Sequence, residues 1–260
     1  MLPSERRRRL LDGLAHDGII AVPELSRRLR VSPATVRRDL QLLEDEGLLR
    51  RVRGGATVAS GLGDTAEPLH REKVRSHAAE KRAIAREAVA RVRNGDVIGL
   101  DSGTTTLALA HELQRFDELT VITTDLQIAL VLADAVGIDV IIVGGSVRGG
   151  LYSVVGPLAE RALGSLNVRI AFLGADAIDV DRGVTNASLS EVALKRTLLR
   201  CAQKRILLAD HSKFDHVSLA EVAQLPTFTE VITDVDLSTS LVDTYRAAGA
   251  ELTLAARRKD

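Results

Sequence analysis

The run from Val22 to Val58, VPELSRRLRVSPATVRRDLQLLEDEGLLRRVRGGATV, constrains the fold more than any other part of this 260-residue chain. Its pattern changes from two short helical repeats to an alternation of apolar and basic residues around two glycines. A helix, a turn, a second helix and a hairpin in this order make a winged helix-turn-helix. The sequence therefore predicts a DNA-binding domain over residues 1–58.

A further helix is expected upstream of this run. Leu10, Leu11 and Leu14 fall on one side of a helical stretch that follows Ser4. Gly18 is expected to end it, because glycine readily takes the left-handed conformation of a helix C-terminus. A short strand at residues 19–20 would then lead into the run.

Proline and serine predict where the two helices of the run begin. Pro23 suits a first helical position, and Leu25 and Leu29 share one face of a short helix. Ser32 before Pro33 predicts the start of the next helix, because a serine hydroxyl accepts a backbone N–H of the first turn. The turn of the motif lies between these helices.

The helix that follows Ser32 has one apolar and one basic face. Val36, Leu40 and Leu43 recur at helical spacing and predict a buried stripe, so the paired arginines between them face outward. Such a helix enters the major groove with its N-terminus first, and arginine can bind a guanine edge bidentately. Gly54-Gly55 suits the tight turn of a basic hairpin. The predicted DNA-binding residues are Ser32, Thr35, Arg37, Arg38, Arg51 and Arg53.

The charge distribution agrees with a DNA-binding N-terminal part. Through Val58 the chain has 12 Lys and Arg against 8 Asp and Glu, a net charge of +4, and the remainder has a net charge of −4. A polyanion-binding module should be the basic part. The alternative is that the arginines only solvate a helix in a protein-binding module. The ordered combination of helix start, buried stripe, paired arginines and basic hairpin favours DNA.

The remaining composition excludes several classes of protein. The single cysteine, Cys201, rules out an intramolecular disulfide framework, and it is not beside clustered histidines. No apolar run is long enough for a signal peptide or a bilayer span. We therefore expect a cytoplasmic protein with no membrane partner, no metal and no cofactor.

Residues 59–77 lose the periodicity of their neighbours and predict a linker and hinge. Glycine, proline and mixed charges dominate this segment. Gly61, Gly63 and Ala66 form a G-x-G-x-x-A string in it, but no strand precedes the string, so it is not a dinucleotide fingerprint. The predicted domains are residues 1–58, the linker 59–77 and a second domain over 78–260.

The second domain alternates between strands and helices. A helical stripe that includes Ile84, Ala88 and Val92 stops at Asn94-Gly95. Apolar, β-rich runs recur at 96–100, 119–123, 138–143, 169–174, 204–209, 230–233 and 250–255. Helical stretches separate most of them, which predicts an α/β fold with a doubly wound, mainly parallel sheet. In such sheets ligands bind beyond the carboxyl ends of the strands.

The segment from Asp101 to Thr106, DSGTTT, follows the first of these strands. Its hydroxyls, its glycine and the free N–H groups of a helix start can form a phosphate cradle, and the same residues also suit a simple N-cap and turn. A Walker loop is absent, which argues against nucleotide hydrolysis. Lys213 follows a buried strand and can neutralise a phosphate, although a lone lysine is more often solvated.

Taken together, these motifs resemble the DeoR family of bacterial transcriptional regulators. The resemblance covers nearly the whole chain. In the N-terminal part it rests on Val31-Ser32, Thr35 to Leu40, Leu43, Gly47 to Leu49 and Arg51 to Ala56. In the second domain it rests on Glu80-Lys81 with Ile84-Ala85, Asp101 to Thr105, Gly144-Gly145 with Arg148, Val155 to Pro157, Ala171 to Asp176 and Asp210 to Phe214.

The resemblance implies a sensor domain related in fold to ribose-5-phosphate isomerase and CoA transferases. Such sensors bind a phosphorylated sugar or related metabolite and usually release DNA when it accumulates. The implied chain is a DNA-binding repressor of carbohydrate metabolism, a dimer or tetramer on a double-stranded operator, although activation remains open. The implied effector-binding residues are Asp101, Ser102, Gly103, Thr104, Thr105, Thr106, Thr123, Gly145, Arg148, Asp176, Glu191 and Lys213.

Three positions depart from the family pattern. Arg53 stands where a wing histidine is usual, Thr124 where asparagine is common, and Arg169 where aspartate is common. The first leaves the sequence preference of the wing open. The other two leave the ligand and the local packing open.

A sugar-phosphate isomerase with an appended nucleic-acid module is the competing prediction. Isomerases of the related fold use paired aspartates, a glutamate base and a lysine. This chain has Leu173 where the first aspartate of their Asp-Gly-Ala-Asp pattern stands, and no lysine near Arg182-Gly183. The missing acid and base partners predict that the protein is not an enzyme.

Overall fold

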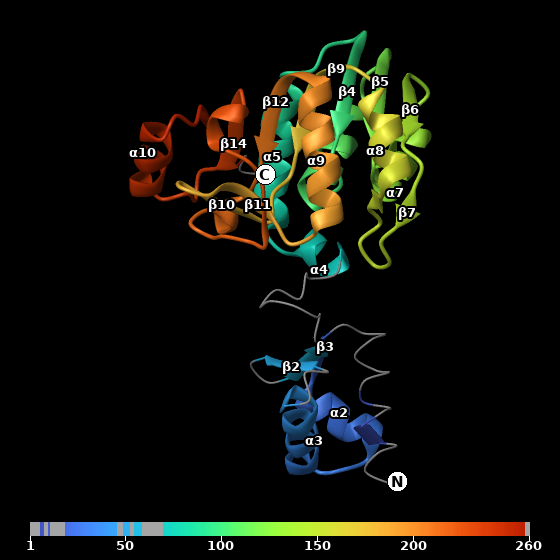
Figure 1. Ribbon diagram of the computed structural model, residues 1–260, viewed down its shortest axis with the longest axis vertical. Helices are drawn as coiled ribbons and strands as arrows, with labels where there is room; N and C mark the ends of the chain where they lie inside the picture. Colours follow the sequence, from blue (N-terminus) through green and yellow to red (C-terminus); the bar gives the residue numbers. More distant parts are fainter. Residues whose placement is uncertain are drawn as a thin grey trace. The chain divides into compact units, whose positions relative to one another are not determined.

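The computed structural model describes residues 6, 7, 10, 19–45, 49–52, 55–58 and 70–257. The chain divides into two compact units, Met1–Leu69 and His70–Asp260, which are treated separately below (Figure 1).

The first unit contains a winged helix-turn-helix, as the sequence predicts. Strand β1 (Ile19–Ala21) leads into α2 (Val22–Leu29) and α3 (Pro33–Asp45), and β2 (Leu49–Val52) and β3 (Gly55–Val58) follow. These strands form an antiparallel sheet in the order β1-β3-β2. Most of the helix expected between Ser4 and Gly18 lies outside the described residues; Arg6, Arg7 and Leu10 are helical.

Gly55 has a different role from the one its sequence context suggests. The sequence predicts a turn at Gly54-Gly55, whereas Gly55 is the first residue of β3 and is paired with both Val52 and Ala21. A Cβ atom at this position would lie 2.4 Å from the carbonyl oxygen of Ile20. The glycine therefore allows β3 to lie close to β1.

The second unit is built on a seven-stranded sheet. Its order is β15-β14-β12-β9-β4-β5-β6, and every pair of neighbours is parallel. The bounds are β4 (Asp96–Leu100), β5 (Leu119–Thr123), β6 (Ile138–Ile142), β9 (Val168–Leu173), β12 (Ala202–Leu208), β14 (Glu230–Asp234) and β15 (Leu252–Ala255). The prediction of a mainly parallel α/β sheet is confirmed.

Helices cover both faces of this sheet. Successive strand residues face opposite sides: Ile170 and Phe172 belong to one apolar cluster, and Ala171 and Leu173 belong to the other. The first cluster includes residues of α5 (Ala78–Val89), α6 (Thr104–Leu113) and α7 (Leu126–Ala133). The second includes residues of α8 (Pro157–Gly164), α9 (Leu189–Cys201) and α10 (Thr239–Ala247). Figure 1 shows α8 and α9 in front of the sheet and α5 behind it.

Shorter elements surround the carboxyl edge of the sheet. A small antiparallel sheet joins β10 (Ala177–Asp179), β11 (Gly183–Asn186) and β13 (Ala220–Ala223), and a two-stranded ribbon joins β7 (Ser146–Val147) and β8 (Val154–Val155). The 3-10 turn η1 (His211–Lys213) follows β12 at this edge, whereas η2 (Leu225–Thr227) precedes β14 and lies at the amino edge.

Helix α4 (His70–Arg75) changes the extent of the predicted linker. The N–H of His70 donates to the Gly150 carbonyl at 3.1 Å, and the Lys73 ammonium lies 3.1 Å from a carboxylate oxygen of Asp176. Residues 70–77, which the sequence assigns to the linker, therefore pack on the second unit. The rest of the predicted linker, 59–69, lies outside the described residues.

No helix within the described ranges combines the length and the apolar character that a membrane span needs.

Candidate functional site: a helix-turn-helix surface and a sensor edge

Helix α3 begins as the sequence predicts. The Ser32 hydroxyl accepts the Thr35 N–H at 3.2 Å, and the two hydroxyl oxygens are 2.9 Å apart. This bond satisfies one of the backbone donors that every helix start leaves without an intrahelical partner. Ser32 is exposed and Thr35 is half-buried, so both predicted residues lie at the accessible start of α3.

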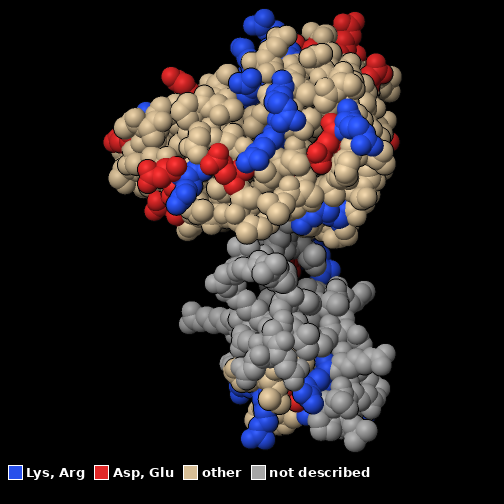
Figure 2. All heavy atoms as spheres, viewed as in Figure 1, with Lys and Arg blue, Asp and Glu red and all other residues tan. Residues whose placement is uncertain are grey.

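The two faces of α3 are also as predicted. Val36, Leu40 and Leu43 are 0%, 1% and 2% exposed, whereas Arg37 and Arg38 are exposed. The arginines are therefore turned away from the core of the unit. Figure 2 shows Lys and Arg side chains at the surface of the described part of this unit.

Asp39 is a residue whose role the sequence did not reveal. It is 4% exposed, and its carboxylate accepts two hydrogen bonds from the Arg6 guanidinium, at 2.5 and 3.0 Å. The two residues are 33 positions apart, so only the tertiary fold brings them together. The pair attaches the N-terminal segment to α3 directly beside Arg38.

Only one of the two predicted wing arginines lies within the described residues. Arg51 lies in β2, paired with Ala56 of β3, so it belongs to the hairpin that the sequence predicts. Arg53 lies outside the described residues. Their contacts with DNA stay predictions.

In the second unit, the start of α6 is an open helix terminus at the carboxyl edge of β4. Among the residues that the structure describes, no side chain caps it, and its N-cap residue is Gly103. The neighbouring helix α7 differs, because the Asp125 carboxylate accepts the N–H groups of Gln127 and Ile128 at 2.8 and 3.1 Å. Backbone N–H groups at an uncapped helix start attract anions. The start of α6 therefore has the donors that a phosphate needs.

The hydroxyl groups around α6 differ in exposure and in whether they already donate a hydrogen bond. Ser102 is half-buried and donates to Asp125 at 2.7 Å, and Thr104 is also half-buried. Thr106 is 0% exposed and donates to the Gly103 carbonyl at 2.8 Å. Thr123 is 1% exposed and donates to the Leu100 carbonyl at 2.9 Å. The hydroxyls of Ser102, Thr106 and Thr123 are thus all engaged by the fold, and their roles as effector ligands stay predictions.

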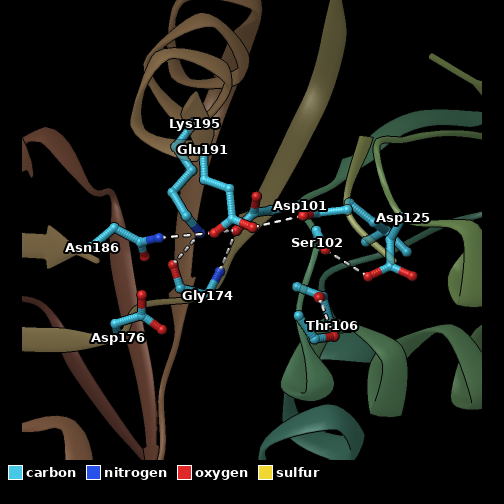
Figure 3. Close-up of polar contacts among 12 residues, drawn as sticks. Asp101, Ser102, Thr106, Asp125, Gly174, Asp176, Asn186, Glu191 and Lys195 are labelled. Carbon is cyan, nitrogen blue, oxygen red and sulfur yellow. Dashed lines mark hydrogen bonds and ion pairs between the residues drawn. The ribbon is translucent and has the colours of Figure 1, made fainter. Parts of the chain in front are cut away.

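A buried ion pair supports the loop that precedes α6. The Lys195 ammonium contacts the Asp101 carboxylate and donates to the Gly174 carbonyl at 2.9 Å, while the Gly174 N–H donates to Asp101 at 3.1 Å. Lys195 and Asp101 are 3% and 5% exposed. Burial lowers the pKa of Lys195, but the carboxylates of Asp101 and Glu191 outweigh burial and raise it above its ordinary value. Figure 3 shows the pair between α9 and β4.

Glu191 is also held by neighbours, although it is one of the predicted sugar-binding acids. One carboxylate oxygen accepts from Arg148 at 2.5 Å and from Ser153 at 2.7 Å, and the other accepts from Asn186 at 3.0 Å. Arg148, a predicted effector ligand, therefore contacts Glu191 directly. Figure 3 shows Glu191 and Asn186 beside Lys195.

Asp176, the second predicted sugar-binding acid, contacts Lys73 of α4. The Ala187 N–H also donates to it at 3.0 Å. Burial raises the pKa of Asp176, but the Lys73 charge and the Ala187 N–H outweigh burial and lower it. Lys73 was missed by sequence analysis because it lies in the predicted linker.

Thr105, Lys213 and Gly145 are the remaining members of the predicted effector set, and Thr105 is 8% exposed. Lys213 is half-buried, and within the described part of the chain its ammonium has no hydrogen bond or ion pair. Burial lowers the pKa of Lys81, and the charge of Lys213 lowers it further. At Gly145 a Cβ atom would lie 2.7 Å from the Val155 carbonyl oxygen, so this glycine allows close packing.

Arg169 has a packing role that explains one departure from the family pattern. Its guanidinium contacts Asp96 through two nitrogens and donates to the Arg91 carbonyl at 2.8 Å. The arginine thus joins β9 to the segment at the start of β4. The pair lies at the amino end of both strands, away from the predicted effector-binding edge.

Comparison with known proteins assigns both units to one family. A DeoR-like helix-turn-helix domain model matches residues 6–61, and a DeoR C terminal sensor domain model matches residues 76–235. The HTH-type transcriptional regulator GolR of Listeria innocua serovar 6a is 34% identical over 255 residues, 98% of this chain and 100% of that protein. The lactose phosphotransferase system repressor of Lactococcus lactis is 33% identical over 240 residues, 92% of this chain and 93% of that protein.

A solved structure of ribose 5-phosphate isomerase A from Methanocaldococcus jannaschii is 22% identical. The similarity covers 54% of this chain and 55% of the isomerase, with a TM-score of 0.41.

Proposed function

The chain belongs to the DeoR family of transcriptional regulators, and on this premise we propose that it represses carbohydrate-metabolism genes until a phosphorylated sugar releases it from DNA. The observation that carries the sensor half of the proposal is the uncapped start of α6. The lactose phosphotransferase system repressor, a relative over 92% of this chain, supports the carbohydrate part.

The DNA half of the proposal rests on the exposed start of α3. Ser32, Thr35, Arg37 and Arg38 would enter the major groove, and the wing with Arg51 and Arg53 would contact the phosphate backbone. Two copies of the chain would place their α3 helices in successive major grooves of a double-stranded operator. The cytoplasm is the compartment in which such a protein would meet DNA.

The sensor half rests on the carboxyl edge of the sheet. The phosphate of the effector would accept hydrogen bonds from the first N–H groups of α6 and from the hydroxyls of Thr104 and Thr105. The Ser102 hydroxyl donates to Asp125 in this structure, so it would have to turn away from that carboxylate to donate to the phosphate. Lys213 would supply a positive charge. Asp176 and Glu191 would accept hydrogen bonds from sugar hydroxyls, which requires that Lys73 and Arg148 share those acids with the ligand.

We favour a sensor over an isomerase because the three acids of the predicted effector set are already engaged. Asp101, Asp176 and Glu191 each accept hydrogen bonds from lysine, arginine or backbone donors. A general base needs a carboxylate that is free to take a proton from the substrate. Turnover of ribose 5-phosphate by the purified protein, without loss of DNA affinity, would instead support the isomerase.

We predict that Arg38→Ala weakens binding to the specific operator by about 1–3 kcal/mol and relaxes its sequence preference, if Arg38 reads a base edge. Arg53→Ala should lower affinity for all sequences more evenly and reduce the salt dependence. Fluorescence anisotropy at several salt concentrations measures both effects. Arg115→Ala, an exposed arginine of the second unit, is the control and should bind like the wild type.

We predict that Lys213→Ala preserves DNA binding and weakens the response to the effector. Loss of a charge-assisted hydrogen bond should raise the sugar-phosphate concentration for half-release about 10- to 100-fold. Folding should be little affected, because the Lys213 ammonium has no hydrogen bond or ion pair within the described structure. Lys213→Arg keeps the charge and should retain more of the response. Loss of operator binding in Lys213→Ala would contradict the assignment.

A thermal-shift screen identifies the effector class. A ligand at about 100 times its Kd stabilises the folded chain by about 2.7 kcal/mol and raises the melting temperature. Phosphorylated sugars should give a shift, and the same sugars without phosphate should not. A shift with the unphosphorylated sugars alone would overturn the phosphate-sensor proposal.

A further inference from the structure

A second group of ligand-type side chains lies at the carboxyl edge of β12 and β14. His77 immediately precedes α5, and Asp210 and His211 follow β12. Each offers one nitrogen or oxygen atom, and these three atoms lie within 4.8 Å of one another. Imidazole nitrogen and carboxylate oxygen are metal ligands. None of these residues belongs to the proposed effector set.

Asp210 has one carboxylate oxygen to which no described residue donates a hydrogen bond. Its Oδ1 accepts from the N–H and the hydroxyl of Ser212, at 3.1 and 2.5 Å. Its Oδ2 has no hydrogen bond within the described structure. Water does not reach this oxygen either, because the residue is only 1% exposed. A buried carboxylate oxygen without a donor is costly, so such an atom indicates a missing ligand.

His211 is held in the orientation that metal-binding histidines usually have. Its Nδ1 lies 2.9 Å from Oδ1 of Asp234, and its backbone N–H donates to Oδ2 of the same residue at 2.8 Å. Asp234 is 0% exposed. Because an ionised carboxylate only accepts, this contact places the proton of a neutral imidazole on Nδ1 and leaves the lone pair on Nε2. A histidine that binds a metal commonly donates its other N–H to a carboxylate in this way.

His77 lies against His211 from a different element. The two rings are perpendicular, with centroids 5.1 Å apart. His77 has a φ of 50°, a left-handed conformation that is uncommon for residues other than glycine. Two imidazoles and one carboxylate thus converge from the start of α5 and the end of β12.

The nearby charges have opposite effects on a cation here. Lys81 and Lys213 oppose it, but the Lys81 ammonium donates to the backbone carbonyls of Lys73 and Ser76, at 2.8 Å in the second case. Asp210 and Asp234 carry two negative charges against the two positive charges of Lys81 and Lys213, so the ion would be held by its bonds to the ligand atoms and not by a net negative charge of the site.

We propose that His77, Asp210 and His211 bind a divalent transition-metal ion of the Zn²⁺ class. Two nitrogen ligands and one oxygen ligand leave a coordination position for water or for an oxygen of a ligand. Ligand bonds of about 2.0–2.2 Å require the three side chains to close slightly around the ion. The ion would attach the start of α5 to the loop after β12. Because His77 follows the residues that join the two units in sequence, occupancy would stabilise that attachment.

The test uses the full chain with its purification tag removed. Zn²⁺ is titrated in competition with a chromogenic chelator, and Co²⁺ is titrated while its visible absorption is recorded. We expect about one equivalent per chain, with intense Co²⁺ bands typical of low coordination number. His77→Asn should lower Zn²⁺ affinity at least about tenfold, and Asp234→Asn by about 10- to 100-fold. Asparagine is chosen for position 77 because it tolerates the left-handed conformation.

His216→Asn is the matched control, since His216 is an exposed histidine in the same loop and lies outside the cluster. It should bind Zn²⁺ like the wild type. Asp210→Asn is a second test, because its Oδ1 can still accept from Ser212. Substoichiometric binding, or equal affinity in wild type, His77→Asn and Asp210→Asn, would overturn the site. These readouts do not depend on DNA or sugar phosphate, so their failure leaves the proposed function standing.

Discussion

Lys195→Met should lower the free energy of unfolding by about 3–5 kcal/mol at neutral pH. The substitution keeps an unbranched apolar side chain on α9 but leaves the Asp101 carboxylate buried without its cationic partner. Asp101 is 5% exposed, so water cannot replace the ammonium. Urea unfolding measures the change.

The double variant Asp101→Asn/Lys195→Met distinguishes the ion pair from simple loss of packing. It removes both charges, and asparagine can still accept the Gly174 N–H, so most of the lost stability should return. Lys204→Met, an exposed lysine of β12, is the control and should change stability little. If Lys195→Met lowers the free energy of unfolding no more than Lys204→Met does, the ion pair does not support the loop before α6.

The free energy of unfolding of the wild type, measured relative to that of Lys81→Met, should increase as the pH rises. Burial lowers the pKa of the Lys81 ammonium from 10.5 to about 8. Between these pH values the unfolded chain binds a proton that the folded chain does not, so raising the pH favours folding. The difference between the two proteins should change by about 2.5 kcal/mol from pH 7 to pH 10.

The comparison isolates Lys81 because other groups titrate in both proteins. Lys204→Met serves again as the control, and its stability should follow that of the wild type across the range. The hydrogen bonds from Lys81 to the Lys73 and Ser76 carbonyls contribute a difference in the free energy of unfolding between wild type and Lys81→Met that does not vary with pH. A difference that does not vary with pH would show that Lys81 is not a buried, destabilised cation.

The sheet could be predicted closely from sequence because its strands are parallel and buried. Such strands read as continuous apolar runs between polar loops, and the runs at 96–100 and 119–123 coincide with β4 and β5. Strand β12 begins earlier than the predicted 204, at Ala202, where Gln203 and Lys204 interrupt the apolar pattern. Ser32 was recognised because helix capping is a local effect.

The contacts of the candidate sites were less predictable because they join distant segments. Asp101 meets Lys195 across 94 positions, and Lys73 meets Asp176 across 103. One signal was present for Lys195, which falls at helical spacing between the buried Val192 and Leu199. A lysine within an apolar stripe indicates a buried charge that needs a partner. Nothing in the sequence identifies which acid supplies it.

The central claim is that a phosphorylated sugar controls DNA binding by this chain. The most direct measurement is fluorescence anisotropy of the full chain on a labelled operator, selected from random DNA, at fixed salt. Addition of the sugar phosphate that stabilises the protein should release the DNA in a saturable manner, and the unphosphorylated sugar should not. Operator binding that is unchanged at saturating sugar phosphate would contradict the account.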